Sequence, residues 1–274
     1  YSEVEEVSGS VGEFQVKVRR KATGVDADIC NGCGVCIEKC PVKEESDFDR
    51  GTMKRKVIYT DFPQAVPDVP VIHWENCIYA KKGKCKICQR FCEPGAVTLD
   101  MEDTFLDFAV GNIIVTTGFQ GFDTDKMRQF GHDRYDNVLD ALEFERMVNA
   151  AGHTEGSIQL ADGSEPESVA IVHCVGSRDV NHHEYCSRVC CMYSVKYAHL
   201  LKEKTNAEVF EYYIDMRCFG KGYEEFYKRN AEEGVRFLRA KPGYITDVPM
   251  NDEEEGKLVV VAEETTLGKI MRVP

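Results

Sequence analysis

The first twenty residues alternate apolar and polar side chains in the way that is typical of a half-buried β-strand. Apolar residues occupy every second position from Phe14 to Val18, and polar residues lie between them. This two-residue period predicts a strand with one buried face. Val4 and Val7 precede a run rich in serine and glycine at residues 8–12, a composition that favours a turn. We therefore expect a β-hairpin over residues 1–20.

The pattern changes several times in the middle of the chain. Residues 61–70 contain three prolines, which predicts an extended surface loop or a contact with a partner. Residues 112–118 form an apolar run that ends in glycine, and we expect a strand there. Between residues 141 and 148 the apolar side chains recur at helical spacing. Residues 151–167 are rich in glycine, serine and glutamate and predict a hairpin or a linker.

From residue 168 the pattern alternates between strand and helix. Strands are expected at residues 169–172, 207–214 and 235–238, with helices at 187–204 and 223–233 between them. Such an alternation predicts a parallel sheet with right-handed crossovers. Residues 257–262 and 269–273 predict a hairpin, and we expect the acidic run Asp252–Glu255 to be a solvated turn.

Charge and composition narrow the possible functions. The 274 residues carry 34 basic and 47 acidic side chains, a net charge of −13, which argues against a nucleic-acid partner. Apolar runs such as Leu258–Ala262 are far too short to span a membrane. The opening residues lack the apolar stretch of a secretory signal, so we expect a cytoplasmic protein. The 13 cysteines, most of them in tight clusters, therefore indicate metal binding rather than disulfides.

Eight cysteines form two copies of one motif. The first run has the spacing C-x2-C-x2-C-x3-C-P of a bacterial two-cluster ferredoxin, and the second repeats it with five extra residues after its first cysteine. In such ferredoxins the fourth cysteine of each run binds the other cluster. We therefore expect two [4Fe–4S] clusters, with Gly32 and Gly34 allowing the tight turns between the ligands. Two zinc sites are the alternative, but zinc would leave one cysteine of each run superfluous. The first cluster is assigned Cys30, Cys33, Cys36 and Cys92, and the second Cys77, Cys85, Cys88 and Cys40.

Four further cysteines lie where a strand ends and a helix begins. Cys174 ends the strand at 169–173, and on the expected helix Cys186 and Cys190 would share one face, with Cys191 beside them. The positive end of the helix dipole would favour an anionic thiolate cluster. We expect a third [4Fe–4S] cluster here; buried structural cysteines are the alternative. Cys218 remains, as a free thiol or as a substitute ligand.

With these motifs the chain resembles the HdrA-type iron–sulfur flavoprotein of heterodisulfide reductase. The resemblance is carried by residues 28–41, 84–92, 173–179, 186–197 and 219–226. The third group is the most specific part, because ferredoxin runs occur in many families.

This resemblance implies an α/β thioredoxin-reductase-like flavoprotein core with an inserted two-cluster ferredoxin-like domain. Residues 1–24 and 101–165 would be pieces of the FAD domain, residues 25–100 the insertion, and residues 166–274 a Rossmann-like second domain that carries the third cluster. Thr116, Thr117 and Gly118 would contact FAD, and Lys196 would lie near the reactive edge of the flavin; a solvated helix face is the alternative for Lys196. The family also implies that FAD bifurcates electrons.

The implied function is that of an oxidoreductase subunit that passes electrons from FAD through the clusters. Its implied partners are disulfide-reducing subunits, an electron-donor hydrogenase or dehydrogenase subunit, and ferredoxin. No GxGxxG phosphate motif occurs in the chain. We therefore expect either a fragment or a subunit whose phosphate-binding half is supplied by another chain. A flavin-free electron relay, an equivalent subunit of another anaerobic reductase complex and a zinc scaffold are the remaining alternatives.

Overall fold

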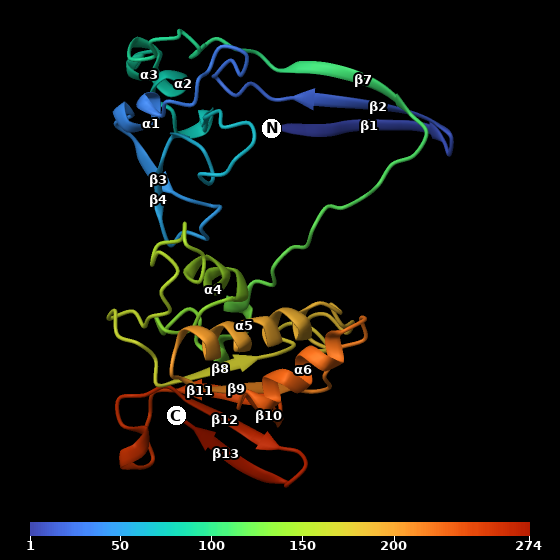
Figure 1. Ribbon diagram of the computed structural model, residues 1–274, viewed down its shortest axis with the longest axis vertical. Coiled ribbons are helices and arrows are strands. Elements are labelled where there is room, and N and C mark those ends of the chain that lie inside the picture. The colour runs from blue at the N-terminus through green and yellow to red at the C-terminus, as the bar shows by residue number, and fades with distance from the viewer. The chain divides into compact units, whose positions relative to one another are not determined.

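The computed structural model describes residues 1–274, which form two compact units. Residues 1–119 make up the first unit and residues 120–274 the second, and each is described by itself (Figure 1). The chain as a whole is of mixed α/β type, with several small sheets rather than one large sheet. No helix in the structure is both long enough and apolar enough to cross a bilayer.

The first unit contains an antiparallel sheet in the order β1-β2-β7. Strands β1 (Ser2–Ser10) and β2 (Glu13–Arg20) form the predicted hairpin, and β7 (Thr104–Val110) pairs with the other edge of β2 (Figure 1). In β2 the side chains alternate between exposed and half-buried, as the two-residue period predicted. The hairpin prediction is therefore confirmed.

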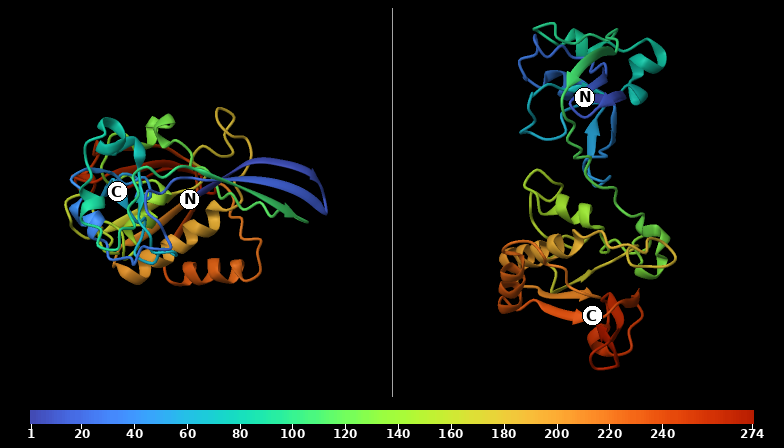
Figure 2. Two further views of the ribbon diagram at one scale, coloured as in Figure 1. Left: turned by 90° about the horizontal axis from the view of Figure 1, so that it is seen from above. Right: turned by 90° about the vertical axis from the view of Figure 1, so that its right-hand side faces the viewer.

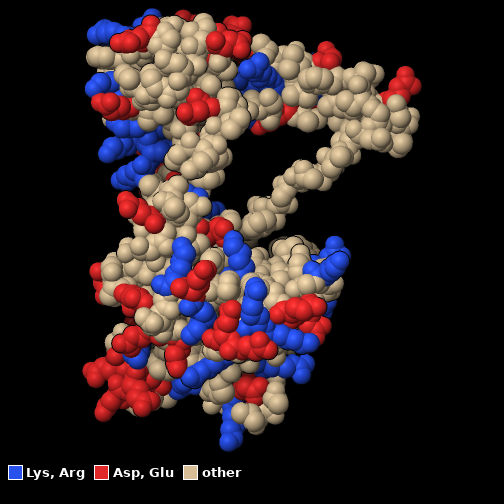
Figure 3. All heavy atoms as spheres, viewed as in Figure 1, with Lys and Arg blue, Asp and Glu red and all other residues tan.

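This sheet leaves much apolar surface open. Phe105 and Phe108 of β7 and Val4 of β1 are each about half exposed or more. In Figure 3 the part of the molecule around β7 is largely uncharged on the face shown. The predicted strand at 112–118 is wrong: these residues adopt no regular structure, and Ile114 is 87% exposed. An apolar run becomes a strand only when a neighbouring strand takes up its backbone hydrogen bonds, and none pairs with this one.

The rest of the first unit is small and rich in turns. Its helices are short: α1 (Val35–Lys39), α2 (Ile78–Lys82) and α3 (Ile87–Arg90), with a 3-10 turn η1 (Trp74–Asn76). Two small hairpin sheets pair β3 (Lys43–Glu45) with β4 (Lys54–Lys56), and β5 (Ile58–Tyr59) with β6 (Val71–Ile72). The predicted loop at residues 61–70 is confirmed.

The core of this part of the first unit is built around cysteines. Val57, Ile58 and Ile72 are almost fully buried. Val25, which precedes the first cysteine run, and Val97, which follows the second, are buried with them. Cysteine side chains pack directly against this core: Cys30, Cys36, Cys40, Cys77, Cys88 and Cys92.

The second unit contains the predicted parallel sheet. Strands β8 (Ser168–Val172), β9 (Glu208–Tyr213) and β10 (Arg236–Arg239) run parallel in the order β10-β9-β8. Helix α5 (Cys190–Lys204) connects β8 to β9, and α6 (Tyr223–Glu232) connects β9 to β10. The two helices lie side by side against the sheet (Figure 2). This β-α-β-α-β order is that of one half of a dinucleotide-binding fold.

Side chains of β9 face two different layers. Val209 packs with Ala198 and Leu201 of α5, and with Met147 of α4 (Ala141–Met147). Phe210 and Tyr212 pack instead with β12 (Val259–Glu264) of an antiparallel meander. The other strands of that meander are β11 (Pro242–Thr246) and β13 (Lys269–Val273). The second unit is thus layered as helices, parallel sheet and meander.

Three details differ from the sequence-based expectations. Helix α5 begins at Cys190 and not at residue 187, because Arg188 adopts a left-handed conformation (φ 64°) that a helix cannot contain. Strand β11 was not predicted. Residues 151–167 form turns, which agrees with the predicted linker and not with the alternative of a hairpin. In the acidic run, which forms the 3-10 turn η4 (Asp252–Glu254), Glu254 is buried and pairs with Arg272 at 2.7 Å, so that the run is not simply solvated.

Candidate metal centres

The first group of thiols surrounds the start of helix α1. Burial, together with the charges of the neighbouring thiols Cys30, Cys92 and Cys33, raises the pKa of Cys36 to about 11. The four cysteines of the predicted first set therefore lie near one another, and Cys30 and Cys92 pack against the core that contains Cys36. Three of them come from one sequence run, and Cys92 comes from the other run.

The second group lies around helix α3. Burial raises the pKa of Cys88 to about 11, and Cys77, Cys40 and Cys85 add like charge. These same four cysteines line one pocket, whose other walls are apolar: Pro41, Val42, Val57, Ile58, Ile72, Ile78 and Ile87. The four thiols thus lie against an aliphatic wall.

Backbone pairing joins the residues before the first cysteine run to the residues after the second. It explains why each group takes one cysteine from the other run. Val25, which precedes the first run, forms an antiparallel bridge with Val97, which follows the second. Asp26 N donates to Ala96 O at 2.8 Å, and Thr98 N donates to Gly24 O at 3.0 Å. The two motif copies are therefore held side by side, and the last cysteine of each copy reaches the other group.

The third group lies at the end of β8 and the start of α5. Cys190 and Cys191 occupy the first turn of α5, and Cys174 follows β8 with a left-handed backbone (φ 58°). Interactions among these three thiols lower the pKa of Cys190 and raise those of Cys174 and Cys191, and the Cys191 thiol donates to Asp215 O at 3.8 Å. Cys186 also acts on Cys174 through its charge.

Cys186 reaches this group from a loop and not from the helix. It precedes the first turn of α5, so the expectation that it shares a helix face with Cys190 is wrong. Arg188 N donates to the Cys186 sulfur at 3.3 Å, within the turn that its left-handed backbone creates. The loop as a whole is closed by a bridge between Ser177 and His183.

The donor chemistry of all three groups fits iron–sulfur clusters. A [4Fe–4S] cluster takes four thiolates, and each group offers four cysteines. None of the 13 cysteines is engaged in a disulfide. A structural zinc site would also accept four thiolates, so the distinction from zinc comes from the ferredoxin spacing of the first two groups.

Three residues near the third group carry buried polar atoms. His173 Nε2 lies 2.7 Å from Glu211 Oε2, and both side chains are fully buried. His173 Nδ1, Glu211 Oε1 and Arg178 Nη1 have no hydrogen-bond partner. Because His173 is bonded to Glu211, it orders the strand end before Cys174 rather than presenting a free ring.

The other residues singled out in the sequence lie outside the three cysteine groups. Lys196, one turn into α5, pairs with Glu145 of α4 at 2.9 Å and is about half exposed. Thr116, Thr117 and Gly118 lie in the irregular exposed segment of the first unit. Cys218 follows β9 in a loop, where burial raises its pKa.

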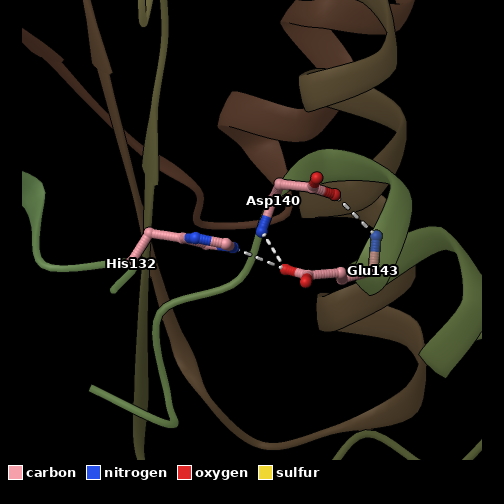
Figure 4. A group of neighbouring side chains, drawn as sticks. All are labelled: His132, Asp140 and Glu143. Carbon is pink, nitrogen blue, oxygen red and sulfur yellow. Dashed lines mark hydrogen bonds and ion pairs between the residues drawn. The ribbon is translucent and has the colours of Figure 1, made fainter. Parts of the chain in front are cut away.

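A group that the sequence did not suggest lies at the start of α4. His132, Asp140 and Glu143 bring three possible ligand atoms within 4.8 Å of one another (Figure 4). Asp140 caps the helix by accepting from the backbone N–H of Glu143 at 2.8 Å, and Glu143 accepts from Asp140 N at 2.6 Å. This capping box, with His132 bonded to Glu143 at 3.0 Å, accounts for the cluster without a metal ion.

Comparison with known proteins shows which proteins the chain is similar to. No protein-family model matches it. It is 45% identical over 274 residues to the A subunit of the H2:CoB–CoM heterodisulfide,ferredoxin reductase of Methanothermobacter thermautotrophicus, and 43% identical over 278 residues to the iron–sulfur A subunit of the CoB–CoM heterodisulfide reductase of Methanocaldococcus jannaschii. These matches cover 98% and 100% of the chain.

A third relative is the A subunit of the ferredoxin/F420H2-dependent CoB–CoM heterodisulfide reductase of Methanosarcina acetivorans, which is 40% identical over 269 residues. The chain spans 40%, 41% and 33% of the lengths of these three relatives. Over nearly its whole length, this chain therefore belongs to the HdrA family of heterodisulfide reductase subunits.

Proposed function

We propose that the chain is the cluster-bearing part of an electron-transfer subunit in a heterodisulfide-reductase-type complex. The observation that carries this proposal is that twelve of the 13 cysteines gather in three groups of four. The names of the relatives add that they belong to reductases of the CoB–CoM heterodisulfide, some of them with ferredoxin. The chain would thus be an oxidoreductase component whose terminal substrate is reduced by partner subunits.

The three cysteine groups would hold three [4Fe–4S] clusters. Cys30, Cys33, Cys36 and Cys92 would bind the first, Cys77, Cys85, Cys88 and Cys40 the second, and Cys174, Cys186, Cys190 and Cys191 the third. Such clusters carry single electrons, at potentials set by net charge, hydrogen bonds and exposure. The protein would position the thiolates, surround those of the second group with aliphatic side chains and place two of those of the third in the first turn of α5, at the positive end of its dipole.

Within the complete subunit, FAD would lie near the third cluster. Residues 1–24 and 101–165 would then belong to the FAD domain, residues 25–100 to the ferredoxin-like insertion and residues 166–274 to a Rossmann-like domain. The parallel β8-β9-β10 sheet supports the last assignment. Lys196 would stabilise reduced flavin by its charge, and Thr116, Thr117 and Gly118 would contact FAD.

Partners would then take the electrons in two directions. We propose bifurcation from FAD to ferredoxin and to a disulfide-reducing subunit, fed by a hydrogenase or dehydrogenase subunit in the cytoplasm. The words "ferredoxin reductase" in the name of a relative support the ferredoxin branch.

A flavin-free relay is the second candidate. It is favoured by the lack of a GxGxxG motif in this chain and by the exposure of Thr116, Thr117 and Gly118. In this case the clusters would only conduct electrons between partner subunits.

One pair of measurements on anaerobically purified material tests both candidates. The chain should be brown, bleach on addition of dithionite and recover on reoxidation, whereas a zinc scaffold would be colourless and would not respond. Flavin released by acid from the intact complex should fluoresce in a fixed ratio to the cluster-bearing chain. A complex with reducible clusters and no flavin would favour the relay, and a colourless chain would contradict both.

A further inference from the structure

Arg178 is a cation that the loop between β8 and α5 folds back onto the third cysteine group. Its charge acts on both Cys174 and Cys186. The backbone holds it there: Ser177 N donates to Cys174 O at 3.2 Å, and Arg178 N donates to Tyr185 O at 3.1 Å. Arg178 has a left-handed backbone (φ 54°), which costs conformational energy that the closed loop must offset.

The guanidinium of Arg178 is anchored on one side only. Nη2 donates to Asp215 Oδ2 at 2.8 Å. Nη1 is buried and has no partner. A buried N–H without an acceptor is costly, so we expect an acceptor at this point. Asp215 links the guanidinium to the cysteine group, because its carboxylate accepts from Arg178 Nη2 at 2.8 Å and its backbone oxygen accepts from the Cys191 thiol at 3.8 Å.

The charges of the two redox states of the cluster predict the direction in which Arg178 shifts its potential. Four thiolates on a [4Fe–4S]2+ core carry a net charge of about −2, and one-electron reduction makes it about −3. A fixed cation beside the cluster stabilises the more negative state more strongly. It therefore raises the potential of the cluster beside it and leaves distant clusters unchanged.

We propose that Arg178 is a charge-stabilising residue of the third cluster, with its free Nη1 donating to the sulfur atoms of that cluster and Asp215 holding the guanidinium in place. This inference rests on the proposed third cluster and goes beyond it, because it assigns a residue that sets the potential. Lysine would keep the charge but not the planar fork of donors.

Arg239 provides a matched control. Its Nη2 lies 3.5 Å from Oδ1 of the same Asp215, but its side chain is 58% exposed. Loss of Arg239 therefore removes one of the two cations beside Asp215. It leaves Arg178, whose charge acts on Cys174 and Cys186, in place.

The test is anaerobic film voltammetry of the full chain with its clusters, together with iron analysis. The couple that disappears in Cys190→Ser identifies the third cluster. In Arg178→Gln this couple should shift to more negative potential while the other two stay in place. Arg178→Lys should give a smaller shift of the same sign, and Arg239→Gln should leave all three couples unchanged.

Several results would overturn the assignment. One is an unshifted third couple in an Arg178→Gln variant of full iron content, and another is an equal shift in Arg239→Gln. If Arg178→Gln loses the cluster, Arg178→Lys decides, because lysine keeps the charge: loss of the cluster from a folded Arg178→Lys chain, or a shift of its third couple to more positive potential, would contradict a charge-stabilising role. Absence of any third couple from the wild-type chain would instead refute the proposed third cluster, and this inference with it.

Discussion

At Gly176 a single added methyl group would collide with an aromatic ring. The residue has φ +72°, and a Cβ atom built on it would lie 2.4 Å from carbon atoms of the Phe122 ring. Phe122 also contacts the rings of His182 and His183, so it cannot move away without disturbing the loop. Gly176 thus lets the loop close and bring Cys186 towards Cys174.

We expect Gly176→Ala to destabilise the second unit and to impair retention of the third cluster. The left-handed backbone alone should cost about 1–2 kcal/mol, and the collision with Phe122 adds to it. Gly163→Ala is the matched control, because Gly163 also has a left-handed backbone (φ +87°) but open space around it. Thermal unfolding and iron content should both fall further for Gly176→Ala; equal effects of the two variants would contradict a role for the Phe122 contact.

At the scale of elements, His132 connects the turn η2 (Thr124–Lys126) to the start of α4. Its Nδ1 lies 2.9 Å from Asp125 Oδ1. Its Nε2 lies 3.0 Å from Glu143 Oε2, a contact drawn in Figure 4. Burial opposes the charged form, but the hydrogen bonds to Asp125 and Glu143 outweigh it and raise the pKa of His132. The positive ring is then held between two carboxylates.

This contact predicts a dependence of stability on pH. Because the folded-state pKa lies above the unfolded value of about 6.5, the stabilisation is complete below that pH and is lost as pH rises through the folded pKa. Thermal unfolding of the wild type at pH 6 and pH 8 should therefore show a loss at the higher pH that is absent from His132→Gln. The exposed His153 offers a control variant, His153→Gln, which should retain the wild-type loss. An unchanged pH dependence in His132→Gln would refute this role.

Most of the helices and strands could be predicted from the sequence. Each of them depends on the spacing of apolar residues within its own segment. The hairpin at residues 1–20, the helix over Ala141–Met147 and the three parallel strands all follow from spacing within one segment. The apolar run at 112–118 failed because pattern alone does not supply a pairing strand. Strand β11 was missed because its pairing with β12 depends on residues far along the chain.

In the candidate sites, too, some features follow from the spacing of nearby residues, whereas others depend on residues far apart in the chain. Ferredoxin spacing predicted which cysteines exchange between the two runs, and the structure brings the same eight together. For the third group, spacing named the four cysteines but misplaced Cys186 on the helix. Arg178 had no sequence signal, because its role depends on a loop whose closure requires Gly176, Phe122 and two left-handed residues.

At the scale of the molecule, the account rests on three clusters distributed over two compact units. The first unit carries eight of the cluster cysteines and the second unit four. Such a distribution suits a protein that collects electrons in one part and delivers them from another. The apolar surface of the β1-β2-β7 sheet is a further property that a larger assembly would account for.

The most direct test is the content of iron and acid-labile sulfide per chain after anaerobic purification, in the wild type and in two cysteine variants. We predict about twelve iron and twelve sulfide per wild-type chain, from three clusters of four. Cys190→Ser should reduce both numbers to about eight, and Cys218→Ser, which removes the one cysteine outside the three groups, should leave them at about twelve. A wild-type chain with about eight iron atoms, or one with zinc in place of iron, would contradict the account.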